Sequence, residues 1–291
     1  MAKTVPGYLG PYRLLNVIHT GHGSQLWQAY DDGKQRMVAV KALLPQFAKD
    51  SEHIGYLRRE YKVGLQVVHQ RIIEVYSLDT DHGIPYLGME WFGALNLKRR
   101  IRSKEDREKL AYLVPKILVE AAEGLGWMHH IGWVHRDVKP DNFLVDEQGQ
   151  AKLIDFGLAL RAQHGWGKLL TRRSKRQGTP SYMAPEQIRC QSVDERMDVY
   201  AFGCMAYEMF AGNPPFTGST REELFTKHLK APPPSLEAVD SNVTAEFAQW
   251  LRRCLAKDPA KRPASAHEML GDLRTMRIFK SMPRRPSSAA S

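Results

Sequence analysis

The chain has 291 residues, of which 43% are hydrophobic, so it can bury the core of one large domain or of two lobes. Its net charge of +10 favours acidic partners, but no zinc finger or aromatic-interleaved RNA-binding motif indicates a specific nucleic acid. Three cysteines without a CxxC spacing argue against a disulfide scaffold or a zinc cluster. The chain lacks an apolar leader and any run of about eighteen apolar residues, so we expect no membrane segment and a cytoplasmic protein.

The N-terminal part of the chain is predicted to form an antiparallel sheet of about five strands with one helix. Short stretches of apolar, aromatic and β-branched residues alternate with turns such as Asp32-Gly33. The first turn, residues 19–25, has the sequence His-Thr-Gly-His-Gly-Ser-Gln and is called the glycine turn below. The strands are predicted at residues 12–18, 26–30, 38–41, 72–78 and 84–91, and the helix at residues 51–68.

The rest of the chain is predicted to be mostly helical. Apolar residues recur at helical spacing from residue 107 to residue 130, which indicates one long helix with a kink at Pro115. The Arg-, Pro- and Ser-rich end of the chain is expected to lack structure. Further helices are predicted near residues 221–229, 243–256 and 264–276.

Residues 135–142, His-Arg-Asp-Val-Lys-Pro-Asp-Asn, carry side chains that suit work beside a polyphosphate. In an extended segment Asp137 and Lys139 point the same way, so one can accept a proton while the other neutralises phosphate charge. The amide oxygen of Asn142 suits Mg²⁺, and Asp155 adds a carboxylate before Phe-Gly. A base, a cation and two metal ligands are therefore close together in the sequence.

These two motifs, together with Gly-Thr-Pro-Ser-Tyr-Met-Ala-Pro-Glu at residues 178–186, resemble the protein kinase family. The lysine two residues after Asp137 is typical of the serine/threonine type, and the lack of insertions resembles bacterial Hanks-type members. The resemblance implies a bilobal α+β fold, with a small antiparallel sheet and one helix in one lobe and mostly helices in the other. The implied parts are a nucleotide-binding lobe over residues 10–92, a catalytic and substrate-binding lobe over 93–276 and a disordered tail over 277–291.

The resemblance also implies a role for each residue of the site. Asp137 would orient the acceptor hydroxyl and accept its proton, and Lys139 would offset charge on the transferring group. Asn142 and Asp155 would hold Mg²⁺, with Mn²⁺ as an alternative. Lys41, paired with Glu60 of the predicted helix, would position the phosphates of ATP. The other implied nucleotide-binding residues are Ile18, Gly21, Leu26, Ala39, Met89, Glu90, Phe92 and Leu144.

The glycine turn departs from the GxGxxG pattern of the family, and two registers are open. Either Gly21 is the first glycine and Leu26 takes the third place, or His19, Gly21 and Ser24 take the three glycine places. We prefer the second, because it puts Leu26 where adenine needs an aliphatic lid. Both registers leave the turn degenerate, so any loss is expected in nucleotide affinity more than in chemistry. Gly64, where the family has a bulky apolar residue, suggests a mobile helix.

The segment over residues 158–183 carries six Lys or Arg residues and no acid. Thr171 and Ser174 lie within this basic cluster. We therefore expect that phosphate on either residue would be held by Arg136 and its basic neighbours, which would regulate activity.

Three structural contacts are implied by the resemblance in the second lobe. Thr179 would bond to Asp137 and Lys139 and help to shape the pocket for the residue after the acceptor. The other two contacts join Glu186 to Arg262, and Asp198 to backbone amides of residues 135–142.

We therefore predict a serine/threonine protein kinase that uses Mg·ATP, acts on protein substrates and is controlled by phosphorylation of the 158–183 segment. An acidic partner or activator is also expected. The main alternative is a pseudokinase that binds nucleotide without transferring phosphate, suggested by His19, Ser24 and Gly64. A small-molecule phosphotransferase would not need the 178–186 element, and a nucleic-acid-binding protein would lose binding steeply with salt.

Overall fold

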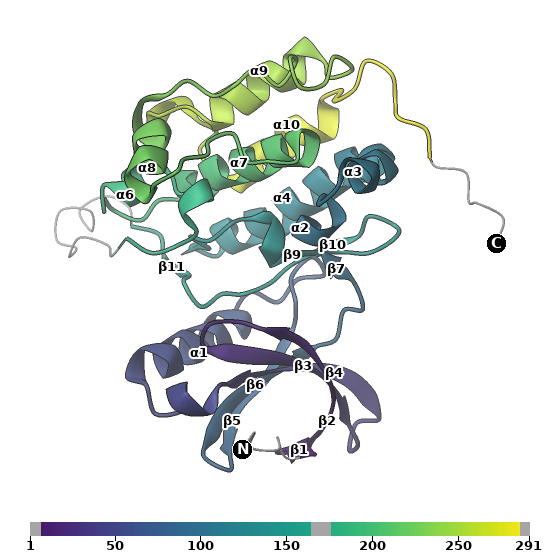
Figure 1. Ribbon diagram of the computed structural model, residues 1–291, viewed down its shortest axis with the longest axis vertical. Helices are drawn as coiled ribbons and strands as arrows, with labels where there is room; N and C mark the ends of the chain where they lie inside the picture. The colour runs from purple at the N-terminus through teal and green to yellow at the C-terminus, as the bar shows by residue number, and fades with distance from the viewer. Residues whose placement is uncertain (1–6, 164–175, 286–291) are drawn as a thin grey trace. The chain divides into compact units, whose positions relative to one another are not determined.

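The computed structural model describes residues 7–163 and 176–285 of the chain (Figure 1). The described chain divides into two compact units. The first contains the residues up to 93 together with residues 155–158, and the second contains residues 94–154 and those from 159 onward. Residues 155–158 therefore pack with the N-terminal part of the chain, although a segment of the second unit precedes them.

The first unit is built on a curled, six-stranded antiparallel sheet with the order β1-β2-β3-β4-β6-β5 (Figure 1). The two-residue strand β1 was not predicted, because so short a strand carries no alternation pattern. Strand β5 begins three residues later than predicted, since Ile72 and Ile73 are buried in the connection before it. The strands are β1 (Tyr8–Leu9), β2 (Tyr12–Thr20), β3 (Ser24–Asp31), β4 (Arg36–Leu43), β5 (Val75–Asp81) and β6 (Ile84–Glu90).

The two faces of strand β4 carry different sets of residues, one in the core of the first unit and one with the predicted nucleotide contacts. Val38, Val40 and Ala42 pack into one buried cluster with Tyr12 and Tyr86. Because successive side chains of a strand point to opposite faces, Ala39 and Lys41 lie on the other face of the sheet. The alternation of β4 therefore places the predicted adenine and phosphate contacts together.

Helix α1 (Ser51–Gly64) begins at Asp50, whose carboxylate accepts hydrogen bonds from the backbone N–H groups of Glu52 and His53. The helix ends at Gly64, which touches β5: a Cβ at this position would lie 2.4 Å from Cγ2 of Val75. The missing side chain lets helix and strand approach closely. Gly64 thus has a packing role, which the sequence did not indicate.

The second unit is mostly helical, with small sheets of order β10-β9-β7 and β11-β8 (Figure 1). Helix α4 packs on α10 and helix α7 packs on α9. The helices are α2 (Leu97–Arg100), α3 (Lys104–Leu110), α4 (Val114–His130), α6 (Pro185–Ile188), α7 (Arg196–Ala211), α8 (Arg221–Lys230), α9 (Ala245–Cys254) and α10 (Ala266–Thr275). The strands are β7 (Leu95–Asn96), β8 (Trp133–Val134), β9 (Phe143–Val145), β10 (Ala151–Leu153) and β11 (Leu160–Arg161). The fold is therefore the predicted α+β arrangement of a small sheet with one helix and a larger helical part.

The prediction of one long, kinked helix over residues 107–130 is wrong. Helix α3 ends at Leu110, a single 3₁₀ turn follows over Ala111–Leu113, and α4 begins at Val114. Pro115 therefore lies in the first turn of a new helix, where its missing N–H costs no hydrogen bond. Periodicity alone did not separate a kink from a break.

The predicted disordered tail is also wrong for its first residues. Ile278 and Phe279 are 3% and 4% exposed, and Phe279 forms a β-bridge with Val243. The N–H of Lys280 donates to the carbonyl of Asn242 at 2.7 Å. Two buried apolar residues and these backbone contacts therefore anchor this part of the basic, Pro/Ser-rich stretch.

Within the described ranges, no helix is long and apolar enough to cross a membrane. All three cysteines are free thiols, and Cys204 and Cys254 are buried. The same residues contain no cluster of three or more His, Cys, Asp or Glu side chains that could hold a metal ion.

Candidate active site

A buried carboxylate supports the start of the 135–142 loop. Asp198, in the first turn of α7, accepts hydrogen bonds from the backbone N–H of His135 at 2.7 Å and of Arg136 at 2.8 Å. Its side chain also contacts Nε2 of His129 at 3.0 Å. The backbone φ of Arg136 is 69°, a left-handed value that is costly for a residue with a Cβ. The two amide bonds to Asp198 thus hold a strained turn, in the place where the sequence predicted this contact.

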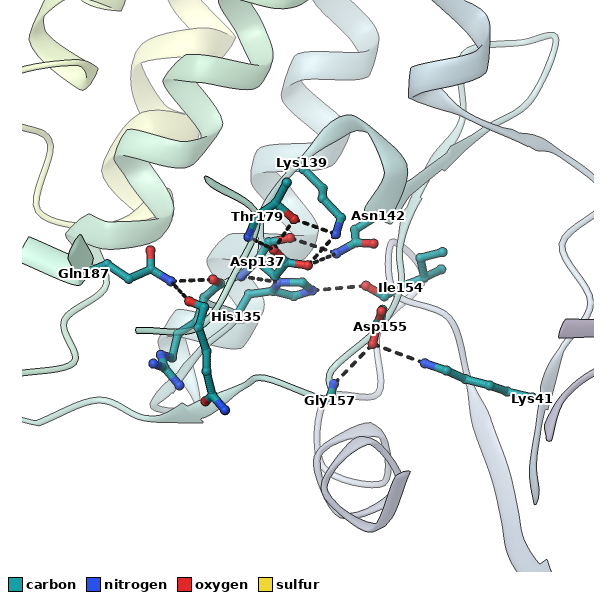
Figure 2. A network of polar contacts seen from close by, with 12 residues as sticks. Lys41, His135, Asp137, Lys139, Asn142, Ile154, Asp155, Gly157, Thr179 and Gln187 are labelled. Carbon is teal, nitrogen blue, oxygen red and sulfur yellow. Dashed lines mark hydrogen bonds and ion pairs between the residues drawn. The ribbon is translucent and has the colours of Figure 1, made fainter. Parts of the chain in front are cut away.

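The carboxylate of Asp137 is held from several sides within the second unit (Figure 2). Nζ of Lys139 lies 2.6 Å from Oδ2 of Asp137 and 2.8 Å from Oγ1 of Thr179. Both the N–H and the hydroxyl of Thr179 donate to Oδ1 of Asp137, each at 2.8 Å. The structure therefore brings these three residues together as the sequence predicted.

Asn142 completes this group. Its Nδ2 donates to the carbonyl of Asp137 at 2.8 Å and to Oδ2 of Asp137 at 3.3 Å. Since the amide nitrogen is turned toward Asp137, the amide oxygen is the atom that can face a cation. The side chain is 5% exposed, so its orientation is set by the surrounding protein.

His135 and Gln187 connect this loop to its neighbours, a role that the sequence reasoning missed (Figure 2). His135 accepts at Nδ1 from the N–H of Asp137 at 3.3 Å, and its Nε2 lies 3.1 Å from the carbonyl of Ile154. Nε2 of Gln187 donates to the carbonyls of Arg136 at 2.9 Å and Gln177 at 2.6 Å. The position of His135 inside the motif was the only signal for it, and Gln187 had none.

In the first unit, Lys41 of β4 forms two ion pairs. Its Nζ lies 2.7 Å from Oε2 of Glu60 in α1 and 3.3 Å from Oδ1 of Asp155. Burial lowers the pKa of Lys41, but Asp155 and Glu60 raise it by more, so the amine stays charged at neutral pH. Burial raises the pKa of Glu60 to about 7, although Lys41 opposes this shift. The expected Lys41–Glu60 ion pair is thus present, and it fixes the charged amine of Lys41 in place.

Asp155 has a left-handed backbone, with φ of 66°. Its Oδ1 accepts from the N–H of Gly157 at 3.4 Å as well as from Lys41 (Figure 2). Nη1 of Arg59 donates to the carbonyl of Gly157 at 3.2 Å and so joins this turn to α1. The side chain of Asp155 is 42% exposed, which suits a ligand for a hydrated cation.

The residues expected around adenine are distributed over both units. In the first unit, Ala39 and Met89 are opposite each other on β4 and β6, and both are nearly buried. The N–H of Glu90 donates to the carbonyl of Glu74 at 2.8 Å. In the second unit, Leu144 lies between buried Phe143 and Val145 on β9, and therefore points to the opposite face.

The glycine turn joins β2 to β3. Leu26 pairs with His19 across the hairpin, and the N–H of Gly21 donates to the carbonyl of Ser24 at 2.9 Å. Ile18 on β2 is exposed. The nucleotide-binding assignments of Ile18, Gly21, Leu26, Phe92 and the adenine-site residues stay predictions, as does the choice between the two glycine registers.

The 178–186 element is anchored by two buried acids. Glu186 forms a two-point ion pair with Arg262, at 2.7 Å and 3.0 Å, as the sequence predicted. The hydroxyl of Tyr182 donates to Oε2 of Glu208 in α7 at 2.6 Å, and Lys98 of α2 pairs with the same carboxylate. The predicted phosphorylation sites Thr171 and Ser174 lie outside the described residues.

The sequence of this chain is similar to those of known proteins. The sequence pattern of the family described as Protein kinase domain matches residues 12–272. The chain is 32% identical over 268 residues to a probable serine/threonine-protein kinase of Streptomyces coelicolor. This match covers 91% of the chain and 39% of the relative. It is 33% identical over 279 residues to the serine/threonine-protein kinase PknB of Mycobacterium tuberculosis; the match covers 93% of this chain and 44% of that relative. For the serine/threonine-protein kinase PrkC of Bacillus subtilis the identity is 30% over 266 residues, and the match covers 91% of this chain and 40% of that relative. The chain thus spans less than half the length of these relatives.

Proposed function

Because the chain belongs to the protein kinase family, we propose that it is a Hanks-type serine/threonine kinase that phosphorylates Ser and Thr residues of proteins with ATP. The observation that carries this proposal is the carboxylate of Asp137, which Lys139, Thr179 and Asn142 hold in one orientation. A base held in this way can align a hydroxyl with a phosphorus atom, which is the main requirement of phosphoryl transfer.

In the proposed reaction, Asp137 binds the acceptor hydroxyl and accepts its proton. The hydroxyl oxygen forms a bond to the γ-phosphorus as the bond from that phosphorus to the bridging oxygen of ADP breaks. Lys139, whose Nζ is 2.6 Å from Asp137, offsets negative charge on the transferring group. Thr179 stabilises the observed orientation of Asp137, since its N–H and its hydroxyl both donate to the same carboxylate oxygen.

The metal-binding part of the proposal rests on the donor atoms of Asn142 and Asp155. An amide oxygen and a partly exposed carboxylate oxygen are hard ligands, which fit Mg²⁺ or Mn²⁺ better than zinc. When bound, such an ion neutralises phosphate charge and orients the β- and γ-phosphates. Asn142 and Asp155 would hold the ion together with phosphate oxygens and water.

Lys41 is proposed to hold the α- and β-phosphates of the same nucleotide. Its charge at neutral pH and its short contact with Glu60 support this role. The adenine ring would lie between Ala39 and Leu144, under Ile18 and Leu26 and beside Met89. The backbone groups of Glu90 and Phe92 would bond to its edge.

Control of activity is proposed to come from phosphate on Thr171 or Ser174. The left-handed turn at Arg136, held by Asp198, would present a guanidinium to that phosphate. The basic 158–183 segment also favours acidic protein substrates or an acidic activator. The lobe limits at residues 10–92 and 93–276 and the cytoplasmic location stay proposals.

The test compares the wild type with Asp137→Asn after incubation with Mg·ATP. Intact mass measures autophosphorylation, and a Ser/Thr peptide library measures transfer to substrates. We expect Asp137→Asn to lower the rate of transfer by roughly two to four orders of magnitude. The matched control is Asp141→Asn, the same change in the same loop at a residue outside the proposed site, which should keep most activity.

Three other outcomes would contradict the proposal. The wild type would be a pseudokinase if it binds nucleotide tightly but transfers no phosphate. The same must hold for wild-type protein that has first been phosphorylated by an added kinase. Transfer to small hydroxyl compounds but not to peptides would identify a small-molecule phosphotransferase. Full activity of Asp137→Asn would exclude the proposed base.

A further inference from the structure

Three rings in the first unit pack against one another and join the glycine turn to α1. His22 comes from the turn, Phe47 from the 3₁₀ turn Pro45–Phe47 and His53 from the first turn of α1. The ring centroids of Phe47 and His53 are 4.2 Å apart with an interplanar angle of 26°. The ring of His22 lies 5.5 Å from Phe47 and 6.2 Å from His53, the latter at an angle of 16°. These three residues are called the clasp below.

Gly23 brings the backbone of the glycine turn directly onto the clasp. A Cβ at Gly23 would lie 2.2 Å from Cδ2 of His53, so no other residue fits without a shift. The carbonyl of Gly23 accepts a hydrogen bond from the N–H of Leu44 at 3.0 Å. By contrast, a Cβ at Gly21 would be 3.6 Å from its nearest neighbour, an ordinary contact. The turn is therefore held at Gly23 and not at Gly21.

His53 is itself fixed in place. Its Nδ1 lies 2.7 Å from Oδ1 of Asp50, the same carboxylate that caps α1. On the other side it meets the ring of Tyr56 edge-on at 6.4 Å. Tyr56 in turn lies beside the Asp-Phe-Gly turn, since a Cβ placed on Gly157 would be 3.6 Å from Cβ of Tyr56. A continuous row of side chains thus runs from the glycine turn along α1 to the turn that carries Asp155.

We propose that His22, Phe47 and His53 are positioning residues, which hold the glycine turn over the phosphates of ATP by tying it to α1. This effect on ATP rests on the function proposed above. In the preferred register, two of the three usual glycine places are taken by His19 and Ser24, so the backbone of the turn has less freedom to fold over phosphate. Stacked rings supply instead a fixed contact with the helix that carries Glu60. The position of the turn and of Glu60 are coupled as a result.

The first test uses the nucleotide-free protein and does not depend on activity. Amide hydrogen exchange of Leu44 reports on its bond to Gly23. We expect His53→Ala to speed this exchange about tenfold. His53→Phe keeps a ring to stack on Phe47 and should restore slow exchange, although it loses the bond to Asp50. Equal exchange in the wild type and His53→Ala, at unchanged thermal stability, would refute the clasp.

The second test is a double-mutant cycle on the KM for ATP. Gly23→Ala is compatible with the backbone, because Gly23 does not have a left-handed φ. The new methyl group should displace the turn and raise the KM for ATP about tenfold, with kcat and the KM for peptide within about twofold. In the His53→Ala background the methyl has room, so the same change should have less than about a twofold effect.

Gly21→Ala is the matched control, since its effect should be the same in both backgrounds. Additive effects of Gly23→Ala and His53→Ala would overturn the inference. If the wild type transfers no phosphate, the proposed function fails, and the exchange measurement still decides whether the clasp exists.

Discussion

Thr179 offers the sharpest test of how the proposed catalytic carboxylate of Asp137 is held. Its hydroxyl donates to Oδ1 of Asp137 and accepts from Nζ of Lys139, both at 2.8 Å, while its N–H makes a separate bond to Asp137. Thr179→Val keeps the shape and the backbone bond but removes both hydroxyl contacts. A hydrogen bond to a charged group contributes about 1.5–3 kcal/mol, and 1.36 kcal/mol is tenfold in rate. If the hydroxyl acts in the transition state as one such bond, kcat/KM for a peptide falls about 10- to 160-fold.

The assay is steady-state transfer from Mg·ATP to a peptide, with Thr179→Ser as the control that keeps the hydroxyl. We expect Thr179→Ser to stay within about fivefold of the wild type. The KM for ATP should change little in either variant, because Thr179 is not among the residues proposed to bind nucleotide. The reasoning is refuted if Thr179→Val keeps wild-type kcat/KM, or if Thr179→Ser is impaired as strongly as Thr179→Val.

Two further predictions concern stability. Arg262→Met leaves Glu186 buried without its partner and should lower the free energy of unfolding in urea by about 3–5 kcal/mol. The control Arg252→Met breaks only an exposed ion pair with Glu237 and should lower that free energy by less than about 1 kcal/mol. Equal losses would show that burial does not decide the effect. Burial lowers the pKa of His228 to about 4 from the ordinary 6.5, so the unfolded chain binds more protons between these values and stability falls as the pH drops from about 6.5 to 4. His228→Gln should reduce the pH slope of the urea unfolding free energy in that window by up to about 1.4 kcal/mol per pH unit, and an unchanged slope would contradict this origin.

The 178–186 element illustrates how the helical unit supports a functional segment. Tyr182 and Lys98 share the buried carboxylate of Glu208, and burial together with Glu208 raises the pKa of Tyr182 well above its usual range. The phenol is therefore protonated at neutral pH and donates to Glu208. The 178–186 element is thus fixed to α7 through the buried carboxylate of Glu208, which also pairs with the partly exposed Lys98 of α2.

Much of the site was predictable from the sequence because its geometry is local. Asp137 and Lys139 share a side because they are two residues apart in an extended segment, and Ala39 and Lys41 share a face of β4 for the same reason. The motif spacing then indicated the family, and the family implied the contacts of Lys41 with Glu60.

The sequence was less informative where similar patterns allow different local structures. Helical periodicity continued across residues 107–130, although Pro115 begins a new helix. Composition indicated a disordered tail, although Ile278 and Phe279 are buried. In both places the local structure depends on one or two side chains, although the composition or periodicity of the whole segment indicated a different structure.

Only the tertiary structure determined which distant groups meet. Asp198 holds the strained turn at Arg136 across 62 positions of the chain, and Nδ1 of His129 accepts from the N–H of Ala266 across 137. The contact of Gly23 with His53 likewise depends on how β3 and β4 bring the turn back to α1. Covalent geometry sets the direction of neighbouring side chains, so the sequence determines it. Burial and close packing depend on the whole chain at once, so only the fold decides which of these side chains come into contact.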